Sequence, residues 1–385
     1  MTAAVRVALV TTDWVDFIEG GVATLCHALA SGLDERGLEV EVWTRGGGRR
    51  ERAIAGRRMS SGAHPYQVRA VPGRSWRRRG GAHWRRALPV LLREFQPAGL
   101  VLSSWELLAA CEDSVAEAGG LPAPVLGVMA HGREITALMD DKRSKARESA
   151  IQRVPRWLVL SDWLGAELRG RGVAAERIVR VPAAVLAPGV FRADCGGLSQ
   201  TLMTLGRLIP RKGQDRVIEA LALLAPSHPE LRYLIVGRGP DEQRLRALAR
   251  RLRVTERVHF VGFAPKPDLE ALWQQADLLV MPARTERGGD TEGYGLCFLE
   301  AGARGLPVLA GRSAGVVSAV QSGENGVLID DPDDPAQLAT ALAELLSAPQ
   351  RLRELGAGGR ARFLRCGQPV HLARGVCEAL QLGAI

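Results

Sequence analysis

Short apolar runs that alternate with amphipathic stretches restrict the fold of this chain more than any other feature. Runs of strand length in the first half lie at Val5–Val10, Val40–Thr44, Gly99–Ser103, Val125–Ala130 and Trp157–Leu160. Runs in the second half lie at Leu202–Leu205, Arg232–Val236, Val258–Val261, Leu278–Met281, Pro307–Ala310 and Gly326–Ile329. Helical stretches separate most of them, and this alternation is typical of parallel sheets. The pattern predicts an α/β fold.

The length and composition indicate two domains. A chain of 385 residues exceeds what one hydrophobic core usually organises, and its apolar share of 46% is enough for two cores. The junction near Ala183–Gly197 is rich in Pro and Gly, which predicts a linker. We therefore expect an N-terminal domain in residues 1–188, a second domain in residues 189–368 and a last helix in residues 369–385.

Two glutamates and two cations mark a candidate ligand site in the second half. Glu292 and Glu300 stand eight positions apart in TEGYGLCFLEA, downstream of Arg207 and Lys212 in GRLIPRKG. Each pair lies where an expected strand passes into a helix, the place where open α/β sheets bind ligands. Carboxylates accept hydrogen bonds from vicinal hydroxyls, and fixed cations neutralise a diphosphate. The pattern indicates a nucleotide sugar, with Glu300 at the ribose, Glu292 at the hexose, and Arg207 and Lys212 at the diphosphate.

The stretch from Leu202 to Asp330 resembles the nucleotide-binding half of the retaining glycosyltransferases of family four. The likeness rests on the glutamate pair and on GR followed, four residues later, by KG. The run MPARTERGGDTEGYGLCFLEA is similar to the bacterial phosphatidylinositol mannosyltransferases, which carry an extended loop before the first glutamate. The resemblance implies a GT-B architecture, in which two Rossmann-like domains face each other across a cleft and the last helix crosses back to the first domain.

The resemblance also implies roles for residues outside the charged pairs. His131, which follows the run Val125–Ala130, is expected to contact a hydroxyl of the donor sugar and to order the cleft; taken alone, a lone histidine is more often structural. Lys266, in VGFAPKP, borders the nucleobase in the family. Gly20 and Gly21 open a helix whose free N–H groups suit phosphate or acceptor, although a glycine pair is also usual in a tight turn. The expected nucleotide-sugar-binding residues are Glu300, Gly20, Gly21, Gly206, Gly262, Phe263, Lys266, Gly293, Tyr294, Gly295 and Leu296.

The expected reaction is the transfer of a hexose, with retention, from a nucleoside diphosphate to a hydroxyl of a lipid-linked or glycan acceptor. The catalytic residues are then Glu292, Arg207, Lys212 and His131. GDP-mannose is the expected donor and a UDP-sugar the alternative; a sugar-nucleotide epimerase of the same architecture stays open. A glycan phosphorylase would need a pyridoxal-binding lysine site and a longer chain, and because neither appears in this sequence we do not expect that activity.

No cofactor and no obligatory metal are expected. Asp330, Asp331, Asp333 and Asp334 are interleaved with prolines before a helix, which is typical of turn and N-cap residues rather than of a metal site. The six cysteines lack the spacings of zinc sites or of a disulfide framework. We therefore expect side-chain cations and helix N-termini to stabilise the leaving diphosphate.

The positive charge of the chain is concentrated in one segment. Residues Arg45 to Arg86 contain thirteen arginines and a single acid, Glu51. Together with Trp76 and Trp84, this composition suits an anionic membrane surface, a polyanionic acceptor or nucleic acid; a solvated loop is the plain alternative. Nucleic acid would leave the glutamate pair unexplained, so we favour the membrane surface. Because no run is long enough to span a membrane and the N-terminus enters a strand rather than a signal peptide, we expect a cytoplasmic protein, peripheral at the inner face of the membrane.

Overall fold

The protein forms two compact α/β units in the computed structural model. The structure describes residues 4–14, 20–46, 58–59, 64–72, 82–117, 122–136, 141–186, 188 and 200–383. One unit takes in residues 1–186 and 368–385, and the other residues 187–367. Each unit is built on its own sheet, and the α/β class expected from the sequence is confirmed.

In the described part of the first unit, the sheet has eight strands in the order β3-β4-β2-β1-β5-β6-β7-β8. All neighbours pair in parallel except β3 and β4, which are antiparallel. Its strands are β1 (Arg6–Thr11), β2 (Glu39–Gly46), β3 (Arg58–Met59), β4 (Gln67–Pro72), β5 (Gly99–Leu102), β6 (Val125–Ala130), β7 (Trp157–Val159) and β8 (Ile178–Arg180).

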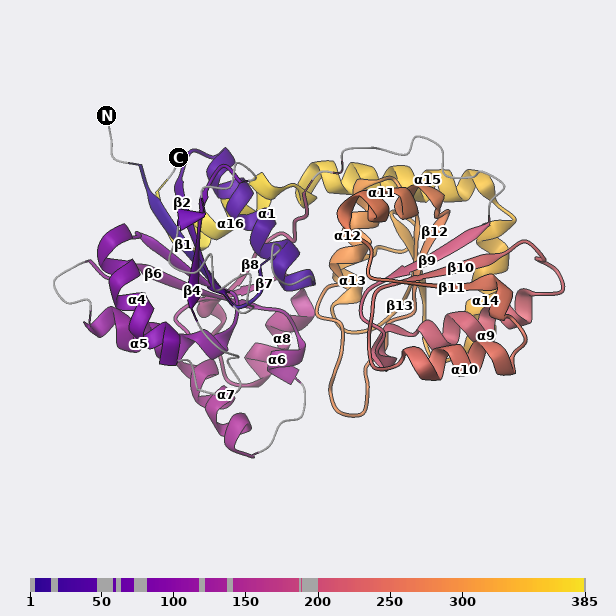
Figure 1. Ribbon diagram of the computed structural model, residues 1–385, viewed down its shortest axis with the longest axis horizontal. Coiled ribbons are helices and arrows are strands. Elements are labelled where there is room, and N and C mark those ends of the chain that lie inside the picture. The colour runs from indigo at the N-terminus through magenta and orange to yellow at the C-terminus, as the bar shows by residue number, and fades with distance from the viewer. Residues whose placement is uncertain are drawn as a thin grey trace. The chain divides into compact units, whose positions relative to one another are not determined.

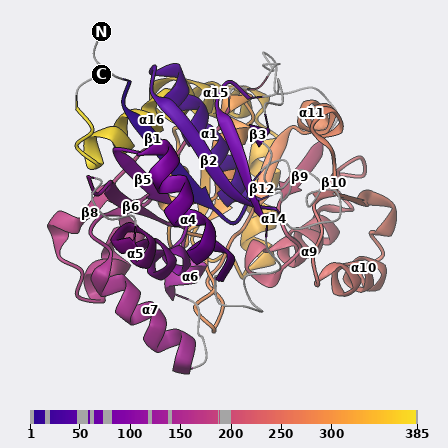
Figure 2. The ribbon, with the colours of Figure 1, turned by 60° about the vertical axis from the view of Figure 1, so that its left-hand side comes forward.

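Helices cover both faces of this sheet (Figures 1 and 2). Its helices are α1 (Gly21–Glu35), α4 (Ala82–Phe95), α5 (Leu108–Glu117), α6 (Arg133–Thr136), α7 (Asp141–Arg153), α8 (Asp162–Gly170) and α16 (Pro369–Ala379). On one face Trp84 and Leu88 of α4 pack into a core with Leu100 of β5. On the other face α16 packs along α1, and Gly32 allows this because a Cβ there would lie 2.1 Å from the carbonyl oxygen of Pro369.

Among the residues described in the second unit, six parallel strands form the sheet, in the order β11-β10-β9-β12-β13-β14. They are β9 (Thr201–Leu205), β10 (Arg232–Val236), β11 (Val258–Gly262), β12 (Leu278–Met281), β13 (Val308–Gly311) and β14 (Gly326–Ile329). The central strands β9, β12 and β13 are almost fully buried, as their apolar sequences require in a sheet covered on both faces.

The helices of the second unit are amphipathic and turn their apolar side chains to the sheet. They are α9 (Gln214–Leu224), α10 (Glu242–Arg251), α11 (Lys266–Gln275), α12 (Leu296–Ala303), α13 (Val316–Ala319), α14 (Pro335–Leu346) and α15 (Pro349–Arg362). In α9, Val217, Ile218 and Leu221 recur at helical spacing and enter a core shared with α10 and α14. The helices α11 and α12 lie on the opposite face (Figure 1).

One expectation for the basic segment is wrong. Trp84 was assigned to an anionic surface, but it is fully buried in the core beneath α4. The indole is apolar enough to fill that core, and the neighbouring Arg85 and Arg86 remain exposed. Arg69 is also engaged, because its guanidinium pairs with Glu41 and Glu94. Trp76 and most of the other arginines lie outside the described residues.

Candidate active site

Two loops at the carboxyl ends of neighbouring strands carry the charged residues in the second unit. One loop follows β9 and ends in the short 3-10 helix η3 (Pro210–Lys212), and the other leads from β12 to α12. The loops touch at Gly213, where a Cβ would lie 2.3 Å from the carbonyl oxygen of Pro282. With φ of 73°, this position also favours glycine for its backbone conformation. Glycine in the KG pair therefore lets the two loops close against each other.

This closure brings Lys212 and Glu292 together, as the sequence suggested for residues of one site. Lys212 Nζ lies 2.5 Å from Glu292 Oε2, and Arg211 donates to the same oxygen. Burial alone would raise the pKa of Glu292, but the two cations outweigh it and lower that pKa to about 2. Glu292 therefore stays ionised at neutral pH, so it can accept hydrogen bonds from sugar hydroxyls but has no proton to donate.

Arg211 is the residue of this cluster that the sequence reasoning missed. It stands beside Lys212 in the RKG run, and its guanidinium lies between the carboxylates of Asp290 and Glu292. Arg207, which was expected with Lys212 at the diphosphate, is exposed in the loop that follows β9, and its backbone carbonyl accepts a hydrogen bond from Gln214 Nε2. Arg211 is thus an arginine of this loop that pairs with Glu292, and the role of Arg207 at the diphosphate stays a prediction.

Glu300 lies in α12, near enough to Lys212 for that charge to act on its carboxyl. Its side chain is half-buried, and its backbone carbonyl accepts a hydrogen bond from Arg304. Burial raises the pKa of Glu300; the positive charges of Arg304 and Lys212 partly offset this, and the negative charge of Glu270 adds to it. The nearby positive charges therefore compensate only in part for the burial of this carboxyl. Hydrogen bonds from hydroxyl groups of a ligand would stabilise its ionised form further.

The residues between the two glutamates shape the turn into α12. Gly295 is the N-cap residue with φ of 88°, and a Cβ there would lie 2.5 Å from the ring of Phe298. Gly293 and Tyr294 are buried, and Leu296 is half-buried as the first residue of the helix. At the end of the neighbouring strand β9, Gly206 lies against the Lys212 side chain. A Cβ added at Gly206 would lie 3.5 Å from Lys212 Cε.

The segment expected at the nucleobase lies at the end of β11. The carbonyl of Gly262 accepts a hydrogen bond from the N–H of Gly237, and Phe263 is 42% exposed. The guanidinium of Arg238 sits over the Phe263 ring at 5.7 Å from its centroid. Lys266 is exposed as the first residue of α11. An exposed ring and a nearby ammonium suit a planar base, which can stack on an aromatic face.

Three expected site residues belong to the first unit. Gly20 caps α1 and Gly21 begins it, at the carboxyl end of β1. His131 follows β6, where its Nε2 lies 2.8 Å from the carbonyl oxygen of Ser103 and its backbone N–H donates to Glu134. The contact with Ser103 orients the imidazole and requires a proton on Nε2, so Nδ1 is the nitrogen available to a ligand.

Two of the four aspartates after β14, Asp331 and Asp334, act as the turn and cap residues expected of them, whereas the side chains of Asp330 and Asp333 form ion pairs with arginines. Asp334 caps α14 by accepting from the N–H of Ala336, and Asp331 accepts from the N–H of Asp333. Among the residues described by the structure, no group of three or more His, Cys, Asp or Glu side chains is arranged to hold a metal ion.

Two family models match the chain, one in each unit. The model described as Glycosyltransferase Family 4 matches residues 19–185, and the model described as Glycosyl transferases group 1 matches residues 199–362. This chain belongs to the family 4 glycosyltransferases. The family expected from the glutamate pair is thereby confirmed.

Known relatives of this glycosyltransferase include the GDP-mannose-dependent alpha-(1-6)-phosphatidylinositol monomannoside mannosyltransferase of Mycolicibacterium smegmatis. It is 42% identical over 160 residues, which cover 41% of this chain and 42% of that protein. The match therefore spans less than half of the relative's length. It confirms the likeness to phosphatidylinositol mannosyltransferases that the loop before Glu292 suggested.

Solved structures share the fold of this glycosyltransferase over nearly its whole length. Sucrose-phosphate synthase of Thermosynechococcus elongatus superposes with a TM-score of 0.81 at 19% identity and covers 98% of each chain. HepE of Anabaena, solved with UDP and glucose, gives 0.76 at 17% identity and covers 97% of this chain and 99% of its own. These likenesses bear on the fold alone, and the expected GT-B class is confirmed.

Proposed function

We propose that this protein transfers mannose, with retention, from GDP-mannose to a hydroxyl of a lipid-linked acceptor. The observation that carries the proposal is the meeting of Lys212, Arg211 and Glu292 at the carboxyl ends of β9 and β12, with Glu300 farther along α12. Cations for a diphosphate and carboxylates for sugar hydroxyls are then held on one edge of one sheet. The mannosyltransferase of M. smegmatis, whose name specifies GDP-mannose, supports the choice of donor and of a lipid acceptor.

The charged side chains of this site suit the following transfer step. In the proposed step the bond between the anomeric carbon and the phosphate oxygen breaks, and a bond to the acceptor oxygen forms on the same face. The proton of the acceptor hydroxyl passes to the departing phosphate. Lys212, Arg207 and Arg211 stabilise the charge that grows on this diphosphate, and the ionised Glu292 holds the sugar through its hydroxyls.

A panel of nucleotides tests the donor. A ligand that binds only the folded protein stabilises it by about 2.7 kcal/mol at a hundredfold excess over Kd, so melting temperatures separate good from poor ligands. We expect GDP to raise the melting temperature more than UDP, ADP or CDP, because Lys266 can engage the O6 and N7 acceptors of guanine. GDP-mannose should also hydrolyse slowly without acceptor, with release of GDP and mannose.

A UDP-sugar is the second candidate donor, since the Anabaena neighbour was solved with UDP and glucose. A larger shift with UDP than with GDP, together with turnover of a UDP-sugar, would establish this alternative and overturn GDP-mannose. If no nucleotide diphosphate shifts the melting temperature, the proposal of a glycosyltransferase fails as a whole.

We further propose that the reaction needs no divalent cation. The side-chain cations near Glu292 supply the charge that a metal would supply in its place. We expect the initial rate to be unchanged by a chelator such as EDTA, measured by donor consumption before and after removal of free metal. Loss of the rate, restored by Mg²⁺ or Mn²⁺ alone, is the contrary result.

A peripheral position at an anionic membrane surface is the last part of the proposal. Within the described residues, no helix combines the length and the apolar character that crossing a bilayer demands. The arginines that would bind such a surface lie in the segment Arg45–Arg86, of which the structure describes only parts. Co-sedimentation with vesicles that contain anionic lipid should fall with added salt, and equal binding to neutral vesicles would refute this reading.

A further inference from the structure

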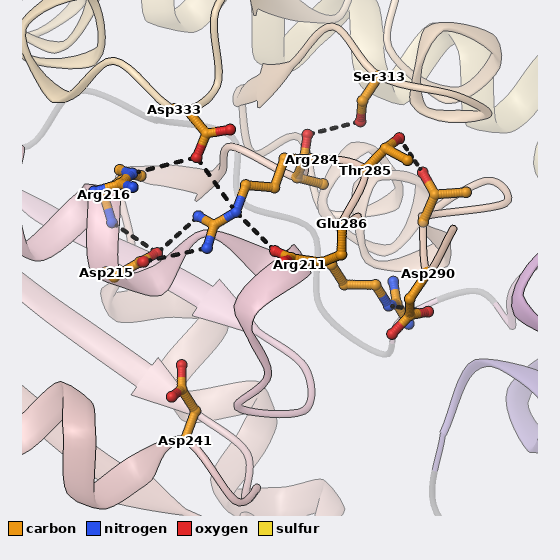
Figure 3. Close-up of polar contacts among 12 residues, drawn as sticks. Arg211, Asp215, Arg216, Asp241, Arg284, Thr285, Glu286, Asp290, Ser313 and Asp333 are labelled. Carbon is orange, nitrogen blue, oxygen red and sulfur yellow. Dashed lines mark hydrogen bonds and ion pairs between the residues drawn. The ribbon is translucent and has the colours of Figure 1, made fainter. Parts of the chain in front are cut away.

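An ion pair of two buried side chains joins the loop that carries Glu292 to helix α9. Arg284, three residues after β12, donates from both Nη atoms to Asp215 of α9, at 2.9 and 3.2 Å (Figure 3). Its Nε donates to Glu286 at 2.9 Å and lies 3.4 Å from Asp333. The Arg284 side chain is 10% exposed and that of Asp215 is 6% exposed. Two residues far apart in sequence thus form a bidentate pair in the interior.

Both legs of the loop are fastened to the segment before α9. On the incoming leg, the backbone N–H of Arg284 donates to the carbonyl of Arg211 at 2.9 Å. On the outgoing leg, Asp290 lies 3.2 Å from Arg211 Nε (Figure 3). The same guanidinium donates to Glu292. The legs are also joined to each other, since Thr285 and Thr291 share a hydrogen bond of 2.8 Å.

Stability alone is a weak reason for such a pair. Removing two charges from water is unfavourable, and apolar residues of similar volume often stabilise a core as well or better. A guanidinium, however, fixes direction, because its planar fork holds a carboxylate at two points. The fork here joins the first turn of α9, which follows Lys212, to the loop that ends in Glu292.

From these contacts we infer that Arg284 and Asp215 are positioning residues for the glycosyl-transfer site. They hold the loop of residues 282–295 against the segment of residues 206–213, so that the carboxylate of Glu292 stays opposite Arg211 and Lys212. Neither residue contacts the donor in this scheme. The inference rests on the proposed function for its kinetic consequence only, because the fastening of the loop is a property of the fold.

Amide hydrogen exchange tests the fastening without reference to activity. Arg284→Lys keeps the charge but loses the fork, and Asp215→Asn keeps the shape but loses the charge. We expect either change to speed exchange in residues 285–295 at least tenfold, while β9 and β12 exchange as in the native protein. Unchanged exchange in this loop for both variants would overturn the inference, whatever the reaction of the protein is.

A matched control is available in the first unit. Arg69 also bridges two carboxylates, Glu41 at 2.7 Å and Glu94 at 2.5 Å, and its side chain is 15% exposed. Arg69→Lys should lower the melting temperature about as much as Arg284→Lys and leave exchange in residues 285–295 unchanged. If Arg69→Lys speeds exchange there equally, the effect reports general loss of stability and the inference fails.

Kinetics then test whether the fastening acts through Glu292. With the sugar nucleotide that the native protein turns over, Arg284→Lys should lower kcat about tenfold and change KM less than threefold. In a Glu292→Gln background the same change should lower kcat less than twofold, because the residue that Arg284 positions has already been lost. Equal effects of Arg284→Lys in both backgrounds would show an independent role and overturn the inference.

Discussion

Replacement of Lys212 by alanine should reduce the transfer rate at least a hundredfold. A preorganised donor aimed at charge that develops in the transition state is typically worth about 10² to 10³ in rate, and Lys212 is a buried cation paired with Glu292. Stability should change little, because Arg211 still pairs with Glu292. The measurement is kcat with saturating donor and acceptor, together with thermal unfolding.

The control for this result is Lys145→Ala, which removes an exposed lysine of α7 in the first unit. That variant should retain full activity. A Lys212→Ala protein that is folded and keeps more than a tenth of the native rate would contradict the assignment of Lys212 to the diphosphate.

Glu292→Gln should cause a similar loss of rate, but with a stability effect that the ion pair makes pH-dependent. The folded-state pKa of about 2 lies below the ordinary value of 4.5, so the ionised carboxylate stabilises the folded protein. The contribution is of the order of 3 kcal/mol at neutral pH, is fully present above about pH 4.5, and is lost as the pH falls toward 2. Native protein and variant should therefore converge in unfolding free energy in acid.

The strands could be predicted where their residues are apolar on both faces. All eleven apolar runs are strands in the structure, with bounds that differ by a few residues at most. The strands β3, β4 and β8 escaped prediction because they are short or carry arginine. β4 reads QVRAVP, and β8 is an edge strand of three residues. At the margin of a sheet, burial is incomplete and the hydrophobic pattern weakens.

The sequence also indicated only some of the residues that meet at the candidate site. A motif with fixed spacing at strand ends indicated Lys212 and Glu292, and the structure brings these two together. Arg211 was missed, because sequence order does not tell which arginine of a loop turns toward a carboxylate. Arg284 and Asp215 gave no signal at all, since charged side chains are assumed to be exposed until a partner is known.

The two glutamates differ in the charges that surround them. Glu292 is saturated with cations, and its pKa is lowered, whereas burial raises the pKa of Glu300 against the partial effect of Arg304. In a donor complex, a diphosphate would compete with Glu292 for Lys212 and Arg211. Glu300 would instead gain donors from the ribose without facing the diphosphate as a competitor for Arg211.

Donor binding should therefore weaken in mild acid, and Glu300→Gln should remove that dependence. Hydrogen bonds from ribose hydroxyls favour the ionised carboxyl, so binding lowers the raised pKa of Glu300 and releases a proton. The affinity of the native protein for the sugar nucleotide is then highest when Glu300 of the free protein is ionised, and it falls as the pH drops through the raised pKa of that carboxyl. Each hydrogen bond to a charged group is worth about 1.5 to 3 kcal/mol, so Glu300→Gln should weaken binding roughly tenfold or more at pH 8.

Calorimetric titration of the sugar nucleotide at several pH values measures both effects. The intact sugar nucleotide is the right ligand, because the terminal phosphate of a free nucleotide ionises near pH 6 and would add its own pH dependence. Native affinity that stays flat as the pH is lowered from 8 to the onset of acid unfolding, or a Glu300→Gln variant that binds as tightly as the native protein at pH 8, would mean that Glu300 does not hold the ribose. Loss of affinity in Glu300→Gln with the native pH slope retained would place the titrating group elsewhere in the site.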